Sequence, residues 1–78
     1  MEKPTQNEIN RMVQLQLGVN IISADNKLIQ DLGAESADIA NIVAAAEEKY
    51  HIDLQESEIA KIITPQDILE LVLSKLNE

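Results

Sequence analysis

Apolar residues recur at helical spacing near the start of the chain, where the pattern predicts a first helix. Thr5 and Glu8 have the spacing of a capping box, so this helix is expected to start at Thr5 and to run to about Leu17. Gly18 follows at the position of a left-handed C-terminal cap. The predicted buried face consists of Ile9, Met12, Val13 and Leu17.

A second helical pattern covers the chain from about Ser36 to Tyr50. Its apolar stripe is formed by Ile39, Ile42, Val43, Ala46 and Tyr50. At about 100° per residue, the opposite face is polar or small. That outward face contains Ala37, Asn41, Ala44 and Glu48, flanked by Asp38, Ala40 and Glu47.

The C-terminal third of the chain predicts a short helix followed by a longer one. The short helix is expected from about Glu56 to Lys61 and contributes Ile59, Ile62 and Ile63. Thr64 can cap the last helix, Pro65 fits its first position, and Asp67 lies near the positive end of the helix dipole. The expected buried stripe of this helix is Leu69, Val72, Leu73 and Leu76.

Residues 19–35 show no sustained period, but they are too apolar for a free linker. We therefore expect a long loop that lies over the core through Ile21, Ile22, Leu28, Ile29 and Leu32. Two glycines and two prolines are too few for a set of strands joined by tight turns. The prediction is an all-α protein: a single domain over residues 1–78, forming a small antiparallel bundle of three main helices and one short helix, with a long loop between the first and second helices.

Composition and charge narrow the function classes. With 45% hydrophobic and 26% charged residues the chain has the composition of a globular protein, and 78 residues leave no room for a separate substrate domain. The net charge of -8 repels nucleic acid and anionic lipid, and favours partners that carry basic patches. The absence of cysteine fits a reducing compartment, and the first residues lack the apolar core of a signal peptide. We expect a cytoplasmic monomer without a membrane span and without a nucleic-acid partner.

Side chains suited to catalysis or metal binding are scarce. His51 is the only histidine, and helical rise places it roughly 20 Å from Ser36, too far for a serine–histidine pair. Neither Asp25 nor Asp31 opens a calcium-loop pattern. We therefore expect no catalytic residue, no metal site and no enzymatic activity.

The segment from Asp31 to Ile39 differs from the rest because a glycine-containing loop leads directly into a helix that starts with a serine. Unpaired backbone N–H groups and the helix dipole favour an anion at such a point. A phosphate ester on Ser36 would be well placed. The alternative from the residues alone is that Ser36 simply caps the second helix.

Two segments resemble motifs of the acyl carrier protein family. Asp31-Leu32-Gly33-Ala34-Glu35-Ser36-Ala37 is similar to the family's D-L-G-x-D-S-L, and Glu47-Glu48-Lys49-Tyr50-His51-Ile52 resembles its E-E-x-F-x-I. The similarity extends through Ile62, Ile63 and Thr64 into the last helix. The resemblance implies that Ser36 bears 4'-phosphopantetheine derived from coenzyme A. The terminal thiol of that arm would carry acyl groups as thioesters.

The resemblance also implies the partners. These are a phosphopantetheinyl transferase and the acyl-loading and acyl-processing enzymes of fatty-acid, lipid or polyketide-type biosynthesis, which would dock through basic patches. Asn41 stands where the family often has a glutamate. Glu35 and Ala37 replace the aspartate and leucine of the motif, and larger apolar residues are common in the family at three further positions, which indicates a specialised carrier; these positions are Ala40, Ala44 and Ala46. The expected docking face comprises Glu35, Ala37, Asp38, Asn41, Ala44, Glu47 and Glu48.

Two alternatives remain beside the acyl carrier. One is an aminoacyl or peptidyl carrier, and the other is an unmodified acidic interaction module with the same fold. The small side chain of Ala46, on the inner stripe, leaves two further alternatives: a pocket beside it that could open to shelter a cargo chain, or closer helix packing with no usable cavity.

Overall fold

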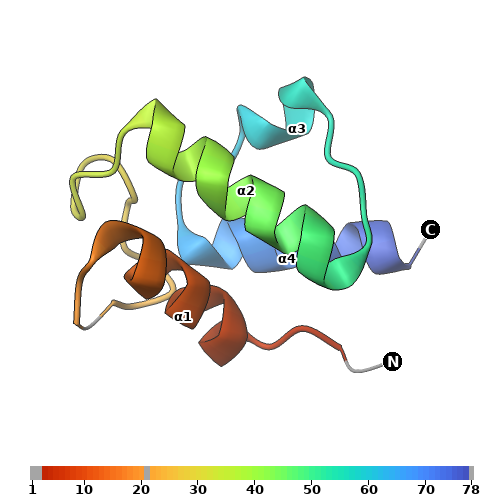
Figure 1. The fold of residues 1–78 in the computed structure, drawn as a ribbon, viewed down its shortest axis with the longest axis horizontal. Coiled ribbons are helices and arrows are strands. Elements are labelled where there is room, and N and C mark those ends of the chain that lie inside the picture. The colour runs from red at the N-terminus through yellow and green to blue at the C-terminus, as the bar shows by residue number, and fades with distance from the viewer. Residues whose placement is uncertain (1–2, 21, 78) are drawn as a thin grey trace.

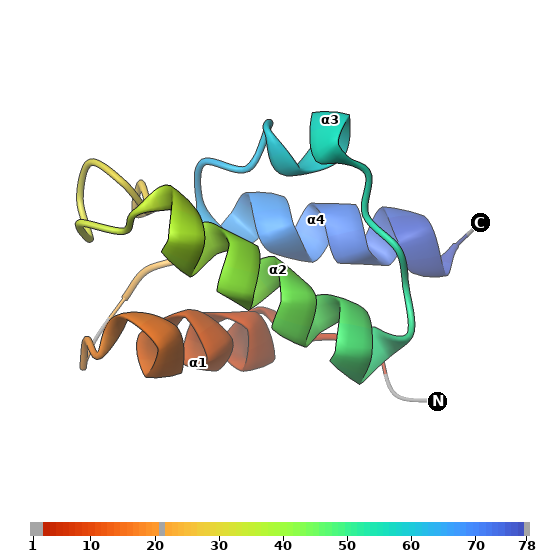
Figure 2. The ribbon, with the colours of Figure 1, turned by 45° about the horizontal axis from the view of Figure 1, so that its top comes forward.

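The computed structural model describes residues 3–20 and 22–77, and within them it is entirely helical (Figure 1). The helices are α1 (Gln6–Leu17), α2 (Ser36–Tyr50), α3 (Glu56–Ile59) and α4 (Pro65–Leu76). The predicted all-α bundle of three main helices and one short helix is confirmed. Figure 2 shows that α1 runs antiparallel to both α2 and α4, while α2 and α4 point in the same direction.

Local side-chain caps start the helices where the sequence places them. The Thr5 hydroxyl accepts the Glu8 N–H at 3.2 Å, and the Thr64 hydroxyl accepts the Asp67 N–H at 3.2 Å. Asp67 returns the contact, because its carboxylate accepts the Thr64 N–H at 3.0 Å. Gly18 ends α1 in the left-handed conformation, with φ of 70°. These predicted caps are confirmed.

The buried side chains form one cluster, in which Tyr50 is the one aromatic member among the described residues, and the inner stripe predicted for α2 is buried along its whole length. Two expectations near the C-terminus are wrong. The buried residues of α4 are Pro65, Ile68 and Val72, because the line of the helix that faces the core runs through Ile68. The other predicted residues of the stripe are only partly buried; these are Leu69, Leu73 and Leu76. Ile63 is 56% exposed instead of buried.

The connection between α1 and α2 covers the end of the bundle at which α2 and α4 begin (Figures 1 and 2). Leu28 is fully buried, and its backbone N–H donates to the carbonyl of Ile63 at 2.8 Å. A second bond joins the Gln66 N–H to the carbonyl of Ala24 at 3.0 Å. The prediction that the loop lies over the core is confirmed through Leu28, while Ile29 is exposed and Ile21 lies outside the described residues.

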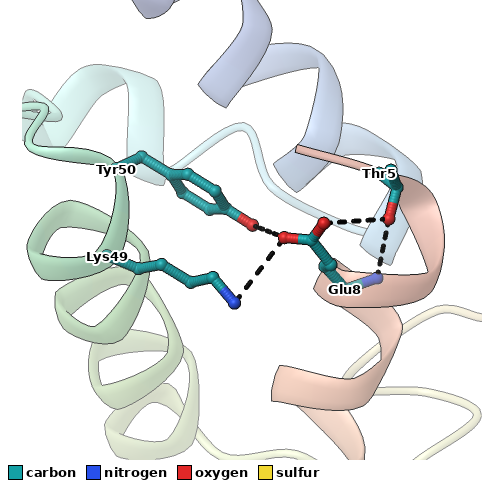
Figure 3. Close-up of polar contacts among 4 residues, drawn as sticks. All are labelled: Thr5, Glu8, Lys49 and Tyr50. Carbon is teal, nitrogen blue, oxygen red and sulfur yellow. Dashed lines mark hydrogen bonds and ion pairs between the residues drawn. The ribbon is translucent and has the colours of Figure 1, made fainter. Parts of the chain in front are cut away.

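Glu8 joins the start of α1 to the end of α2 (Figure 3). Its carboxylate accepts the Tyr50 hydroxyl at 3.1 Å and lies 3.6 Å from the Lys49 ammonium. Tyr50 is only 6% exposed. Burial, together with the hydrogen bond to Glu8 and the negative charge of that carboxylate, raises the pKa of Tyr50 to about 12.

This raised pKa predicts a loss of stability in alkaline solution. The unfolded chain releases the phenol proton near pH 10, whereas the folded chain keeps it up to about pH 12. The free energy of unfolding should therefore fall by roughly 2–3 kcal/mol across that interval, and the component should vanish in Tyr50→Phe. Urea titrations of both proteins at a series of pH values measure it. Identical alkaline losses in both proteins would contradict the assignment.

Candidate functional site

The start of α2 is held by two acidic residues and not by the serine between them. Glu35 occupies the N-cap position with an extended backbone, φ of -102° and ψ of 168°. The Asp38 carboxylate accepts the Glu35 N–H at 2.9 Å. Ser36 is therefore the first residue of the helix, and the alternative in which Ser36 acts as the cap is wrong.

Ser36 is exposed, and among the described residues no hydrogen bond involves its hydroxyl group. The loop before it is braced internally, since the Lys27 N–H donates to the Asp31 carboxylate at 2.8 Å and the Gly33 N–H donates to the Ile29 carbonyl at 3.2 Å. Gly33 has φ of 73°, a conformation that other residues rarely adopt, so this position favours glycine. The loop thus delivers an unengaged hydroxyl to the positive end of α2, where a phosphate ester is favoured.

A groove of about 400 Å³ starts at Ser36 and runs between α2 and α3. Its walls come from the long loop, from one face of α2 and from the region of α3, and they are mostly apolar. Glu47 adds a carboxylate, which is also bound by the Leu54 N–H at 2.9 Å. The lining residues are Ile29, Ser36, Ile39, Ala40, Val43, Glu47, Ile59, Ala60 and Ile62.

This groove does not include the position expected for a pocket, Ala46, although Ile39 and Val43 of the same inner stripe line it. Ala46 has no exposed surface and does not line the groove, whereas Ala40 is exposed and does. The contributions of Ile29 and Ala60 were missed from the sequence. No local sequence pattern predicts that these two residues line the groove, because they belong to segments that only the tertiary fold places beside α2.

The residues expected to form the docking face divide into two groups. Asp38 and Glu47 are partly buried, and each carboxylate accepts a backbone N–H, so both help to hold α2 and its connections. The others are exposed along the outer side of α2 or just before it. These are Glu35, Ala37, Asn41, Ala44 and Glu48.

The remaining candidate positions lie away from Ser36. His51 is exposed and ends α2 in a left-handed conformation with φ of 56°, its N–H donating to the Glu47 carbonyl.

Among residues 3–20 and 22–77, no three His, Cys, Asp or Glu side chains gather closely enough to hold a metal ion. None of the helices in that same part of the chain has both the length and the apolarity to cross a membrane.

Comparison with known proteins decides the family. The family model described as "phosphopantetheine attachment site" matches residues 7–72 of this chain. The chain belongs to the acyl carrier protein family. A relative named acyl carrier protein from Campylobacter hominis is 37% identical over 59 residues, which cover 76% of this chain and 75% of the relative. Another acyl carrier protein, from Campylobacter lari, is 30% identical over 67 residues, covering 83% and 87% of the two chains.

A solved structure agrees on the fold. The crystal structure of an acyl carrier protein from Thermotoga maritima superposes with a TM-score of 0.76, covering 91% of this chain and 85% of that one at 22% identity. The family model shows a phosphopantetheine attachment domain in this chain, and 4'-phosphopantetheine is its cofactor. Members of this family carry groups for other enzymes, which implies a phosphopantetheinyl transferase and further partner enzymes.

Proposed function

We propose that the Ser36 hydroxyl is the attachment point of the 4'-phosphopantetheine arm. The observation that carries this proposal is the position of Ser36: an exposed, unengaged hydroxyl at the first position of α2, in the segment that resembles the family motif. The match to the attachment-site family includes this segment. Gly33, Glu35 and Asp38 support the site by fixing the loop and the helix start around it.

Attachment requires a base, and within residues 3–20 and 22–77 no group forms a hydrogen bond with the Ser36 hydroxyl that would let it serve as one. As the Ser36 oxygen forms a phosphodiester bond, the pyrophosphate bond of coenzyme A breaks, adenosine 3',5'-bisphosphate leaves, and the hydroxyl proton passes to a base of the transferase. When bound, the arm supplies a thiol that holds acyl groups as thioesters. The chain itself has no cysteine, so its carrier chemistry depends on that arm.

The groove beside Ser36 supports a role for the fold in protecting the cargo. Ile39, Val43 and Ile62 give its walls an apolar character, and burial of the first carbons of an acyl chain there would be favourable by about 0.8 kcal/mol per methylene. Water would have reduced access to the thioester. This favours an acyl cargo over an aminoacyl one.

The exposed acidic side chains support docking of basic partners along α2. Glu35 and Glu48 remain available for this purpose, with Ala37, Asn41 and Ala44 as small neighbours that let a partner approach closely. Asp38 and Glu47 add negative charge while bound to the backbone. The protein would act as a monomeric single-domain carrier and not as an enzyme, and its cysteine-free sequence fits the cytoplasm.

Incubation with coenzyme A and a phosphopantetheinyl transferase tests the attachment point. Intact mass should show one phosphopantetheine addition on the wild-type protein and none on Ser36→Ala, because that variant lacks the attacking oxygen. Ser57→Ala, which removes an exposed serine of α3, is the matched control and should be modified like the wild type. If transferases of several specificities leave the wild-type mass unchanged, the unmodified interaction module becomes the better description. If Ser36→Ala also gained a phosphopantetheine arm, the attachment point would be a residue other than Ser36.

A further inference from the structure

Two exposed isoleucines lie beside the attachment loop. Ile29 and Ile63 are each 56% exposed, although the core of this small protein is built from the same kind of side chain. The bond from the Leu28 N–H to the Ile63 carbonyl, at 2.8 Å, brings the two segments together. A hollow of about 230 Å³ between them defines what we call the isoleucine patch, lined by Lys27, Ile29, Gln30, Ile62 and Ile63.

The isoleucine patch is continuous with the groove that starts at Ser36. Ile29 and Ile62 line both hollows, so they form a shared wall. A protein surface that covers the Ser36 hydroxyl must therefore lie against or very near the patch. Leu15, the other large apolar side chain with high exposure among the described residues, belongs to α1 and lines neither hollow.

We propose that the isoleucine patch is a docking surface for the phosphopantetheinyl transferase, and that it receives an apolar side chain of that enzyme. This inference rests on the proposed function of Ser36. The transferase must bring its catalytic groups to the Ser36 oxygen itself, whereas enzymes that act at the far end of a long arm tolerate looser placement. Ala37 offers little apolar surface beside Ser36, and the patch supplies such an anchor next to the groove that Ser36 lines.

The charge around the patch specifies the partner further. Lys27 lines the hollow and is exposed, and within residues 3–20 and 22–77 no carboxylate forms an ion pair with its ammonium group. Two acidic residues are exposed in or next to α2 in the sequence: Glu35, just before the helix, and Glu48, within it. A fitting transferase therefore presents basic residues to α2 and an acidic residue, next to its apolar anchor, to Lys27. Contacts of opposite sign at the patch and along α2 would fix the orientation of docking.

A second copy of this chain is a poorer occupant of the patch. Each copy has a net charge of -8, so association brings together two strongly negative molecules. The two half-exposed isoleucines also offer far less area than the roughly 1,200 Å² that stable interfaces bury. A transferase covers Ser36 and α2 as well, so for that partner the patch needs to provide only one part of the contact.

The rate of arm transfer from coenzyme A tests the proposal, with a transferase that modifies the wild-type protein as the probe. In the double variant Ile29→Ser/Ile63→Ser, kcat/KM for the carrier should fall about tenfold, mainly through KM. Leu15→Ser is the matched control, because it removes an equally apolar side chain that is 73% exposed on α1, and it should keep the wild-type rate. Thermal unfolding of all variants verifies that they remain folded.

A second variant, Lys27→Glu, tests the charge at the patch separately from its apolar packing. Lys27→Glu should also slow transfer through KM, and added salt should narrow its difference from the wild type, whereas the defect of the double isoleucine variant should persist in salt. Wild-type kinetics in the double variant and in Lys27→Glu would overturn the docking surface while leaving Ser36 as the attachment point. An unchanged transfer rate with faster thioester hydrolysis would assign the patch to the cargo and overturn it too. Failure of every transferase on the wild type would overturn the proposed function itself.

Discussion

Leu28→Ala is expected to lower the free energy of unfolding by about 2–5 kcal/mol. Leu28 is fully buried although it belongs to a connection without regular secondary structure, so its side chain is the main apolar anchor of that segment. Truncation removes the buried methyl groups and leaves a cavity between the loop and the helices. Urea denaturation measures the loss. Leu15→Ala, at a position 73% exposed, should stay within about 0.5 kcal/mol of the wild type.

The same substitution should loosen the loop that leads to Ser36. Both backbone polar groups of Leu28 form hydrogen bonds. The N–H donates to the Ile63 carbonyl at 2.8 Å, and the carbonyl accepts the Ala34 N–H at 2.9 Å. Hydrogen exchange should therefore accelerate at Leu28 and Ala34 more than in the middle of α2. A stability unchanged by Leu28→Ala, or uniform exchange along the chain, would show that the loop is held mainly by its backbone bonds.

Helix positions followed from the sequence wherever the signals were local. The bounds of α2 agree with the prediction because its apolar stripe continues without interruption over about three turns, from Ile39 to Tyr50. The starts of α1 and α4 were predictable from Thr5 and Thr64, whose caps need no distant partner. The predicted short helix extends less far, ending at Ile59.

The errors arose where distant contacts choose between local alternatives. The sequence of α4 offers apolar residues around much of the helix, and packing against α1 and α2 selects the line through Ile68. The side chain of Ile63 is exposed, while its backbone carbonyl accepts a hydrogen bond from the Leu28 N–H. At the start of α2, the sequence offered Ser36 as the cap, and the backbone conformation assigns the cap to Glu35 instead.

The candidate site was predictable in one part and not in another. Ser36 follows from the motif and from its place at the start of an amphipathic helix. The groove does not, because Ile29, Ala40 and Ala60 are brought together only by the packing of three separate segments. Similarly, the sequence treats Glu47 and Glu48 as equivalent acids. Only the structure shows that Glu47 binds the Leu54 N–H, while Glu48 is exposed.

The difference between two alanines of α2 gives the second large prediction. Ala46 is fully buried in the core, whereas Ala40 is exposed on the wall of the groove. Leucine at position 46 must displace neighbouring core side chains, so Ala46→Leu should cost about 1–3 kcal/mol of unfolding free energy. Leucine at position 40 extends into open groove space, so Ala40→Leu should leave stability within about 0.5 kcal/mol of the wild type.

The effects of the two variants on cargo protection should be the reverse of their effects on stability. In protein loaded with thioesters of graded chain length, Ala40→Leu should change which lengths resist hydrolysis, because the added side chain takes up space along the path from Ser36 into the groove. Ala46→Leu should leave that length profile unchanged, since residue 46 has no surface on the groove. Denaturation of the unloaded proteins and hydrolysis rates of the loaded ones measure the two effects separately. If Ala46→Leu preserved stability and shifted the length profile, the inner stripe of α2 would have to open during cargo binding, and the groove between α2 and α3 would not be the main shelter.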